Sequence, residues 1–162
     1  MIEQCRADDR EFLRAMLASL RPTDRLEIHC LTDGLEEELF QSVKNSAECY
    51  KVQSKDGRPY ALFGAVLVPG EDGALIWCVC SVFIREKWLS FARESRRILR
   101  RWVKEYGVRY NVVAGFDSQA VAWLSWCGAR LFEPNPLGRH GEMFRRFEIR
   151  KEETACAASL GG

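Results

Sequence analysis

The chain has 162 residues, 47% of them hydrophobic and 29% charged, a composition typical of one globular domain with a buried core. Its 24 Lys and Arg residues nearly balance 23 Asp and Glu residues, and the net charge of +1 gives no support to a dedicated nucleic-acid binder or a polybasic membrane binder. No apolar run approaches the roughly 18 residues that span a bilayer, and the N-terminus lacks a signal-peptide pattern. We therefore expect a cytoplasmic-type domain over residues 1–152 and a flexible C-terminal tail over residues 153–162.

The seven cysteines do not form a recognisable framework. Their number is odd, no Cys-x-x-Cys occurs, and only His29 and His140 accompany them. Cys78 and Cys80 are two apart in an apolar run, where a strand places both side chains on one face. Small buried thiols in a reduced compartment are therefore favoured over disulfides or a redox site, and we expect no metal.

The first half of the chain predicts a strand, two helices and three further strands. Residues 2–6 predict the first strand, and apolar residues at helical spacing predict a helix that Pro22 ends. A second helix is expected at residues 35–43, with acidic residues in its first turn. Alternation and turn residues then predict three successive antiparallel strands, at residues 49–53, 60–68 and 74–82.

The second half predicts a long helix at residues 85–106, followed by a strand, a short helix and two strands. The apolar face of the long helix carries Phe91, Ile98, Leu99, Trp102, Val103 and Tyr106. The opposite face carries Arg93, Arg96, Arg97, Arg100 and Lys104. That basic face is explained by solvation alone, although it also suits an acidic surface, the phosphate of a ligand or nucleic acid. The remaining elements are expected at residues 110–116, 118–127, 130–133 and 144–150, with Gly107 and Gly128 ending the two helices.

This order of elements predicts an α+β fold with helices on both faces of a mixed sheet. The segment from Asp117 to Ala129 is similar to an Asn-x-x-Ala…Gly-Phe helix, with Asp117 at the Asn position and Ala129 at the Phe position. Residues 6–9 are similar to the segment that leads into the first helix in the proteins that share this pattern. The chain thus resembles the GNAT acetyltransferase superfamily, which implies six to seven mostly antiparallel strands, splayed central strands and acetyl-CoA as co-substrate.

Further segments support a narrower resemblance that covers nearly the whole chain. They are Leu20-Arg21-Pro-Thr-Asp24-Arg-Leu-Glu27, Asp56-Gly57-Arg-Pro59, Phe63-Gly64, Trp77, Ser90-Phe-Ala-Arg93-Glu-Ser-Arg96-Arg97, Tyr110-Asn111-Val112, Trp123-Leu124-Ser-Trp126-Cys-Gly128 and Phe144-Arg-Arg-Phe147-Glu148. In order and spacing they resemble small phage and prophage proteins of the GNAT fold. That group includes the minor internal (core) virion protein of short-tailed phages.

The GNAT resemblance implies that the pantetheine arm of acetyl-CoA lies between the fourth and fifth strands. Cys80 and Val82, at the end of the predicted fourth strand, are then candidate cofactor-binding residues. The Tyr that often protonates the leaving thiolate in such enzymes is replaced here by Leu124.

The same resemblance implies a pyrophosphate site at the start of the long helix. The superfamily's Arg/Gln-x-x-Gly-x-Gly/Ala loop aligns with residues 87–92, which contain no glycine. In one interpretation Lys87 and Arg93 meet phosphates while Ser90 and Ala92 let the backbone approach. In the other, the loop has degenerated, with Trp88 where the ligand would approach, and the fold persists as a structural module.

Arg21, Asp24 and Glu27 are spaced by three and share one face if their segment is helical. They form either a surface ion-pair ladder or, as the resemblance implies, part of the acceptor groove. In the second case Glu27 is the candidate catalytic base, with His29 in reserve, and Arg21 and Asp24 contact substrate. Asp117, after the fifth strand, is a helix cap or a further substrate-binding residue.

Two functions remain open from the sequence. The first is an acetyl-CoA-dependent N-acetyltransferase of phage or prophage type, acting on an unidentified amine. The second is a catalytically inactive GNAT-fold protein, such as a phage internal virion protein, with a phage or host protein as partner. We expect neither nucleic acid nor a membrane as partner, and a location in the host-cell cytoplasm or in a virion.

Overall fold

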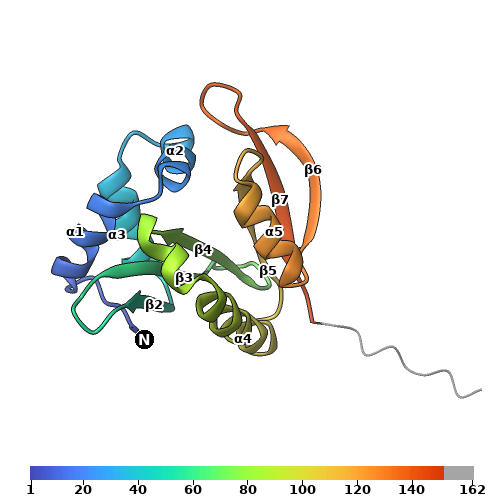
Figure 1. Ribbon diagram of the computed structural model, residues 1–162. Coiled ribbons are helices and arrows are strands. Elements are labelled where there is room, and N and C mark those ends of the chain that lie inside the picture. The colour runs from blue at the N-terminus through green and yellow to red at the C-terminus, as the bar shows by residue number, and fades with distance from the viewer. Residues whose placement is uncertain (152–162) are drawn as a thin grey trace, which may run out of the picture.

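The computed structural model describes residues 1–151, so the tail predicted at residues 153–162 lies outside the described residues. Residues 1–151 form a seven-stranded sheet in the order β1-β2-β3-β4-β5-β7-β6 (Figure 1). The strands are β1 (Ile2–Gln4), β2 (Glu48–Gln53), β3 (Pro59–Leu67), β4 (Ala74–Cys80), β5 (Arg109–Ala114), β6 (Arg130–Pro136) and β7 (Met143–Ile149). β4 and β5 run parallel, and the other neighbours in this sheet are antiparallel.

Helices cover both faces of the sheet, which confirms the predicted α+β class (Figure 1). They are α1 (Arg10–Ser19), α2 (Pro22–Leu31), α3 (Leu35–Asn45), the 3-10 helix η1 (Val82–Lys87), α4 (Trp88–Tyr106) and α5 (Ser118–Trp126). α4 and α5 pack over the larger core, while α1 and α3 enclose a second core on the opposite face. Within residues 1–151, no helix is both long and apolar enough to cross a membrane.

The region before β2 differs from its prediction. Residues 1–47 contain three helices rather than two, because Pro22 both follows α1 and begins α2. Proline lacks a backbone N–H and has a fixed φ, so it is disfavoured inside a helix and suited to the first position of one. Between the two helices, Leu20 forms a bridge with Ser81 at the end of β4. This bridge brings the start of α2 to the middle of the sheet.

The start of the long helix also differs from its prediction. β4 ends at Cys80, not at residue 82, and the 3-10 helix η1 separates it from α4. Ser81 begins η1 because its Oγ accepts a hydrogen bond from the Phe83 N–H at 3.2 Å. At the other end, Gly107 stops α4 as predicted, with φ +80° and its N–H bonded to the Val103 carbonyl.

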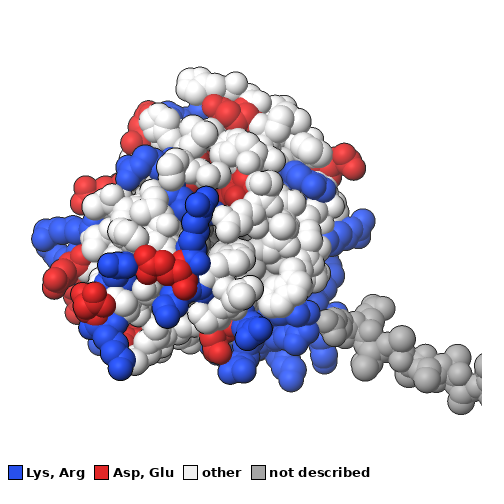
Figure 2. Space-filling view, in the orientation of Figure 1, with Lys and Arg blue, Asp and Glu red and all other residues white. Residues whose placement is uncertain are grey.

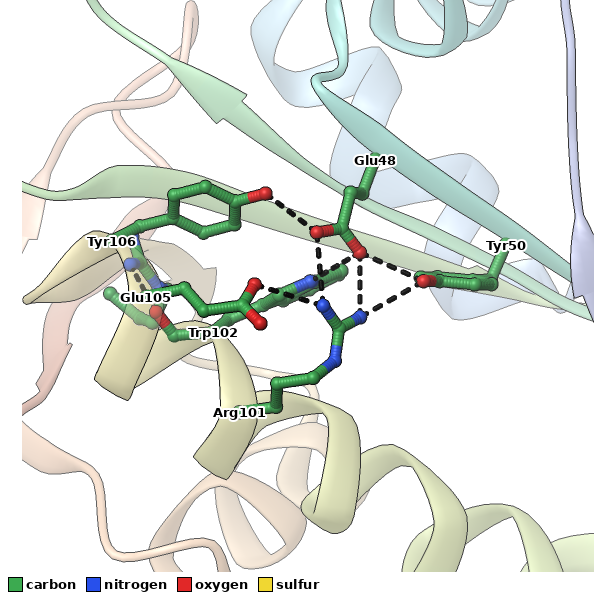
Figure 3. A network of polar contacts seen from close by, with 7 residues as sticks. Glu48, Tyr50, Arg101, Trp102, Glu105 and Tyr106 are labelled. Atoms are coloured by element: carbon green, nitrogen blue, oxygen red, sulfur yellow. Dashed lines mark hydrogen bonds and ion pairs between the residues drawn. The ribbon is translucent and has the colours of Figure 1, made fainter.

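A polar network on Glu48 fastens the C-terminal half of α4 to β2 (Figure 3). The Glu48 carboxylate accepts hydrogen bonds from Arg101 at 2.6 Å, Trp102 Nε1 at 2.9 Å, Tyr106 OH at 2.6 Å and Tyr50 OH at 2.8 Å. The Arg101 hydrogen bond is the main cause that holds the pKa of Glu48 well below its usual range.

Candidate active site

The sheet opens between β4 and β5. The two strands pair at only two positions, Ala74 with Arg109 and Leu75 with Tyr110, and then separate. A parallel ladder leaves its backbone groups unbonded wherever the strands part, and buried groups of this kind need other partners. The groups that bond to the separated parts of β4 and β5 therefore outline the candidate site.

Asn111 fills the first position after the pairing ends. In a regular parallel ladder the next hydrogen bond would run from the Val112 N–H to the Ile76 carbonyl. Instead, Asn111 Nδ2 donates to the Ile76 carbonyl at 2.7 Å, and Asn111 Oδ1 accepts from the Val112 N–H at 2.7 Å. One carboxamide therefore lies between the two strands and satisfies a backbone group of each.

The α2 region provides hydrogen-bond partners for the backbone at the wide end of the opening, where β4 ends at Cys80 and β5 ends at Ala114. Glu27 Oε2 accepts a long hydrogen bond, 3.4 Å, from the Ala114 N–H. Asp24 Oδ2 accepts one of 3.4 Å from the Cys80 N–H, and the Arg21 N–H donates to the Cys80 carbonyl at 2.9 Å. The α2 region thus replaces part of the missing ladder.

Cys78 lies between these two sets of contacts. The Ser81 N–H bonds to the Tyr60 carbonyl of β3, so the odd-numbered residues of β4 bond to β3 and the even-numbered ones direct their backbone groups toward β5. Among residues 1–151, no group bonds to the N–H or the carbonyl of Cys78 in this direction. One position of the opened ladder therefore stays vacant for hydrogen bonding.

A cavity of about 360 Å³ occupies the opening, and its lining comes from both faces of the sheet. On the α4 and α5 side it is aromatic: the ring centroids of Trp88 and Phe91 lie 6.0 Å apart, and those of Phe91 and Trp123 lie 6.2 Å apart. The buried indole Nε1 of Trp123 has no hydrogen-bond partner within residues 1–151. The cavity thus combines apolar walls with a few unpaired polar groups, as ligand sites usually do.

On the α2 side, the cavity wall is charged. Arg21 joins three side chains: its Nε contacts Asp24 Oδ2 at 2.5 Å, its Nη2 contacts Asp117 Oδ2 at 3.1 Å and its Nη1 donates to Gln119 Oε1 at 2.7 Å. Burial opposes the charge of Arg21, but the hydrogen bond and charge of Asp24 outweigh it and raise the Arg21 pKa. Asp117 also caps α5, because its Oδ1 accepts from the Ala120 N–H at 3.0 Å. The ion pairs tie α2 to α5 across the wide end of the opening.

Glu27 lines the same cavity, and its pKa is raised to about 7. Burial is the largest cause, and the Asp24 and Asp117 carboxylates add to it, whereas the Ala114 N–H acts in the opposite direction. A carboxyl group with a pKa near 7 is suited to accepting a proton from a reacting group at neutral pH.

The structure brings some of the predicted site residues together and separates others. Arg21, Asp24, Glu27, Cys80 and Asp117 all line the cavity. The remaining predicted residues lie outside its lining, on η1 and the first turns of α4: Val82, Lys87, Ser90, Ala92 and Arg93.

Those outer residues surround the beginning of α4. Lys87, Ser90 and Arg93 are exposed, whereas Ala92 is buried and Val82 lies on η1. The Ser90 Oγ donates to the Lys87 carbonyl at 2.9 Å. Farther along, exposed basic side chains of α4 contribute to the blue surface at the lower edge of Figure 2. The arrangement puts cations beside the first turn of a helix that starts next to the cavity.

The sequence analysis assigned no site role to three features of the cavity. They are the Asn111 side chain between the strands, the free backbone groups of Cys78 and the aromatic wall at Trp123. Asn111 carried a usable signal, since asparagine is depleted in strand interiors. Within residues 1–151, no group of three or more His, Cys, Asp or Glu residues has the arrangement to hold a metal ion.

No protein-family model matches the sequence, and neither does any curated protein. Solved structures with a similar fold do exist. The chain is 12% identical to a Bacillus subtilis acetyltransferase in complex with CoA, with a TM-score of 0.66 and coverage of 93% of this chain and 97% of that one. The fold is that of the GNAT acetyltransferases.

Two further GNAT structures agree with this assignment of the fold. The ribosomal-protein-S18-alanine N-acetyltransferase of Escherichia coli is 10% identical, with a TM-score of 0.67 and coverage of 93% of this chain and 92% of its own. A mutant spermidine N-acetyltransferase of Vibrio cholerae is 14% identical, with a TM-score of 0.64 and coverage of 93% and 94%.

Proposed function

We propose that this protein is an acetyl-CoA-dependent N-acetyltransferase of phage or prophage type. The observation that carries the proposal is the vacant hydrogen-bonding position at Cys78, in a cavity that Glu27 also lines. The similarity to a GNAT structure that contains CoA supports the choice of co-substrate.

The residues of the cavity fit the arm of CoA. An extended arm that carries amides pairs with a free strand position, and the N–H and carbonyl of Cys78 offer one donor and one acceptor. The aromatic wall of Trp88, Phe91 and Trp123 suits its methylene groups, and the unpaired Trp123 indole N–H offers a further donor. At the outer end, Lys87 and Arg93 beside the first turn of α4 suit the phosphates.

Glu27 is the proposed general base. Acetyl-CoA supplies the activated acyl group, as a thioester. Glu27 takes one proton of an ammonium acceptor, directly or through one water, and the freed amine forms its bond to the acyl carbon as the carbon–sulfur bond breaks. The nitrogen releases its second proton to solvent as the neutral amide forms. The neighbouring Asp24 and Asp117 favour a cationic acceptor electrostatically. Because Leu124 occupies the position of the usual Tyr, the departing thiolate takes its proton from solvent.

A second candidate is a catalytically inactive GNAT-fold protein of a phage particle. The observation that favours it is the occupied backbone of Cys80, whose N–H and carbonyl are already bonded to Asp24 and Arg21. The glycine-free first turn of α4 points the same way. This candidate predicts neither turnover nor acetyl-CoA binding.

A turnover assay with the variant Glu27→Gln separates the two candidates. The wild type should release CoA when it is given acetyl-CoA and a panel of amines that includes spermidine and a peptide with N-terminal alanine. Glu27→Gln should keep the acetyl-CoA affinity but lower kcat by about 10²–10⁴-fold, because it loses the base. The wild-type kcat should also rise with pH through about 7, the pKa of Glu27.

Glu36→Gln serves as the control, because Glu36 is an exposed residue of α3 outside the cavity lining. It should behave like wild type. A Glu27→Gln variant with an unchanged kcat and pH profile would exclude Glu27 as the base. A wild type that binds no acetyl-CoA would favour the inactive candidate.

A further inference from the structure

We propose that Asn111 is a positioning residue that holds β4 and β5 apart before any ligand binds. Its carboxamide occupies the first position at which the parallel ladder ceases, in contact with Ile76 on one strand and Val112 on the other. The consequence for acetyl-CoA binding rests on the proposed function, whereas the separation of the strands does not.

The side chain of Asn111 has the required bonding groups. A neutral carboxamide offers an N–H donor and a carbonyl acceptor, and the two backbone groups left by the missing bond are one acceptor and one donor. In a closed ladder, one hydrogen bond joins the Ile76 carbonyl to the Val112 N–H. Here two hydrogen bonds and the carboxamide of Asn111 lie between these two groups, so the strands are farther apart. Both groups are thereby satisfied without the strands coming together.

The contacts of Asn111 are shorter than those at the wide end of the opening. Both of its hydrogen bonds measure 2.7 Å, whereas the bonds from Glu27 to Ala114 and from Asp24 to Cys80 measure 3.4 Å each. The carboxylates at the wide end also belong to α2, a separate element, while Asn111 is part of β5 itself. Asn111 is therefore the contact that fixes where the sheet opens.

The position of Asn111 determines which backbone groups are left for a ligand. If Val112 bonded directly to Ile76, the next bonds of the ladder would join Val112 and Ala114 to Cys78, the vacant position of the site. By preventing the first of these bonds, Asn111 keeps the Cys78 groups available. A residue poorly suited to a strand interior is thus present where an ordinary strand residue would close the cavity.

The variant Asn111→Val tests this proposal, because valine favours strands and cannot bridge them. We expect the ladder to extend, with new cross-strand nuclear Overhauser contacts between residues 76–78 and 111–113 and slower amide exchange at Val112. The thermal midpoint should stay within about 3 °C of wild type or rise, while the acetyl-CoA affinity should fall at least tenfold. Retained stability with lost binding is a combination that a merely structural residue does not give.

Two further variants complete the test. Asn111→Asp keeps the acceptor for Val112 but places a carboxylate against the Ile76 carbonyl, so both stability and binding should fall. Asn135→Val makes the matched change at an exposed position of β6 and should alter neither.

The proposal is overturned if Asn111→Val leaves the cross-strand contacts unchanged, or binds acetyl-CoA as wild type does. If wild type itself binds no acetyl-CoA, the proposed function fails, and the cross-strand contacts of Asn111→Val still decide whether Asn111 separates the strands.

Discussion

At the scale of single residues, two glutamates show how surroundings set opposite pKa shifts. Glu27 is half-buried and accepts a long hydrogen bond from the Ala114 N–H, so burial outweighs this bond and raises its pKa to about 7. Glu48 receives bonds from four side chains, chiefly from Arg101, so its pKa is lowered. The folded state therefore favours a protonated Glu27 and an ionised Glu48.

These shifts have opposite effects on stability. Because the folded pKa of Glu27 exceeds its ordinary value of 4.5, its contribution decreases as pH rises from about 4.5 to about 7. The contribution of Glu48 is present above pH 4.5 and is lost as pH falls below that value.

We predict that Glu48→Gln lowers the free energy of unfolding at pH 7 by about 1.5–3 kcal/mol, because the four hydrogen bonds to a half-buried charge weaken. The deficit should shrink at pH 3, because Glu48 is then largely protonated in the unfolded chain and its ionisation on folding offsets part of the gain from the network. Urea unfolding at the two pH values measures both quantities. Glu105→Gln, which removes one exposed partner of Arg101, should cost less than about 1 kcal/mol. Equal deficits for Glu48→Gln at both pH values would contradict this account.

At the scale of elements, α2 is the part of the chain on which the candidate site most depends. Its spacing of Arg21, Asp24 and Glu27 was visible in the sequence, and the ion pair that this spacing predicts between Arg21 and Asp24 is present. It is not a surface pair, since Asp24 is buried and Arg21 also reaches across to Asp117, which caps α5. The helix itself was not predicted as a separate element. Its hydrophobic and polar residues separate weakly, so its first residue, Pro22, appeared only as the end of α1.

We predict that Arg21→Ala destabilises the protein by about 3–5 kcal/mol, because it leaves the buried Asp24 and Asp117 carboxylates without their cation. The change should also speed amide exchange in α2. Arg25→Ala, on the same helix, removes an exposed bond to the Leu17 carbonyl and should cost less than about 1 kcal/mol.

A double variant identifies the cause. Asp24→Asn combined with Arg21→Ala should recover part of the loss, since one unpaired charge is removed. Chemical denaturation measures the free energy of unfolding of the two single variants and the double variant. If the two single losses simply add in the double variant, an electrostatic role for Arg21 is contradicted.

At the scale of the whole molecule, the order of strands and helices followed from local patterns, apart from α2 and η1, which were not predicted as separate elements. The two-faced α4, the turns between β2, β3 and β4, and the Gly107 stop are each encoded within a few residues, and each agrees with the structure. The GNAT fold followed from that order together with the resemblance.

The centre of the site did not follow, because it depends on contacts between distant residues. Asn111 meets Ile76, 35 positions earlier, and Ala114 meets Glu27, 87 positions earlier. Such contacts depend on the register of two strands and the placement of α2, which no local spacing determines. The candidate residues of α2 could therefore be identified individually from the sequence. The free backbone groups of Cys78, in the opened ladder, could not.

The most direct test of this account is a backbone NMR titration of the wild-type protein with CoA. If the arm of CoA joins the opened ladder, the amide of Cys78 should show a large, saturable shift and gain protection from exchange, with smaller changes at Trp123 and the first turn of α4. An amide of Cys78 that stays unchanged at millimolar CoA would contradict the assignment of the cavity to the co-substrate.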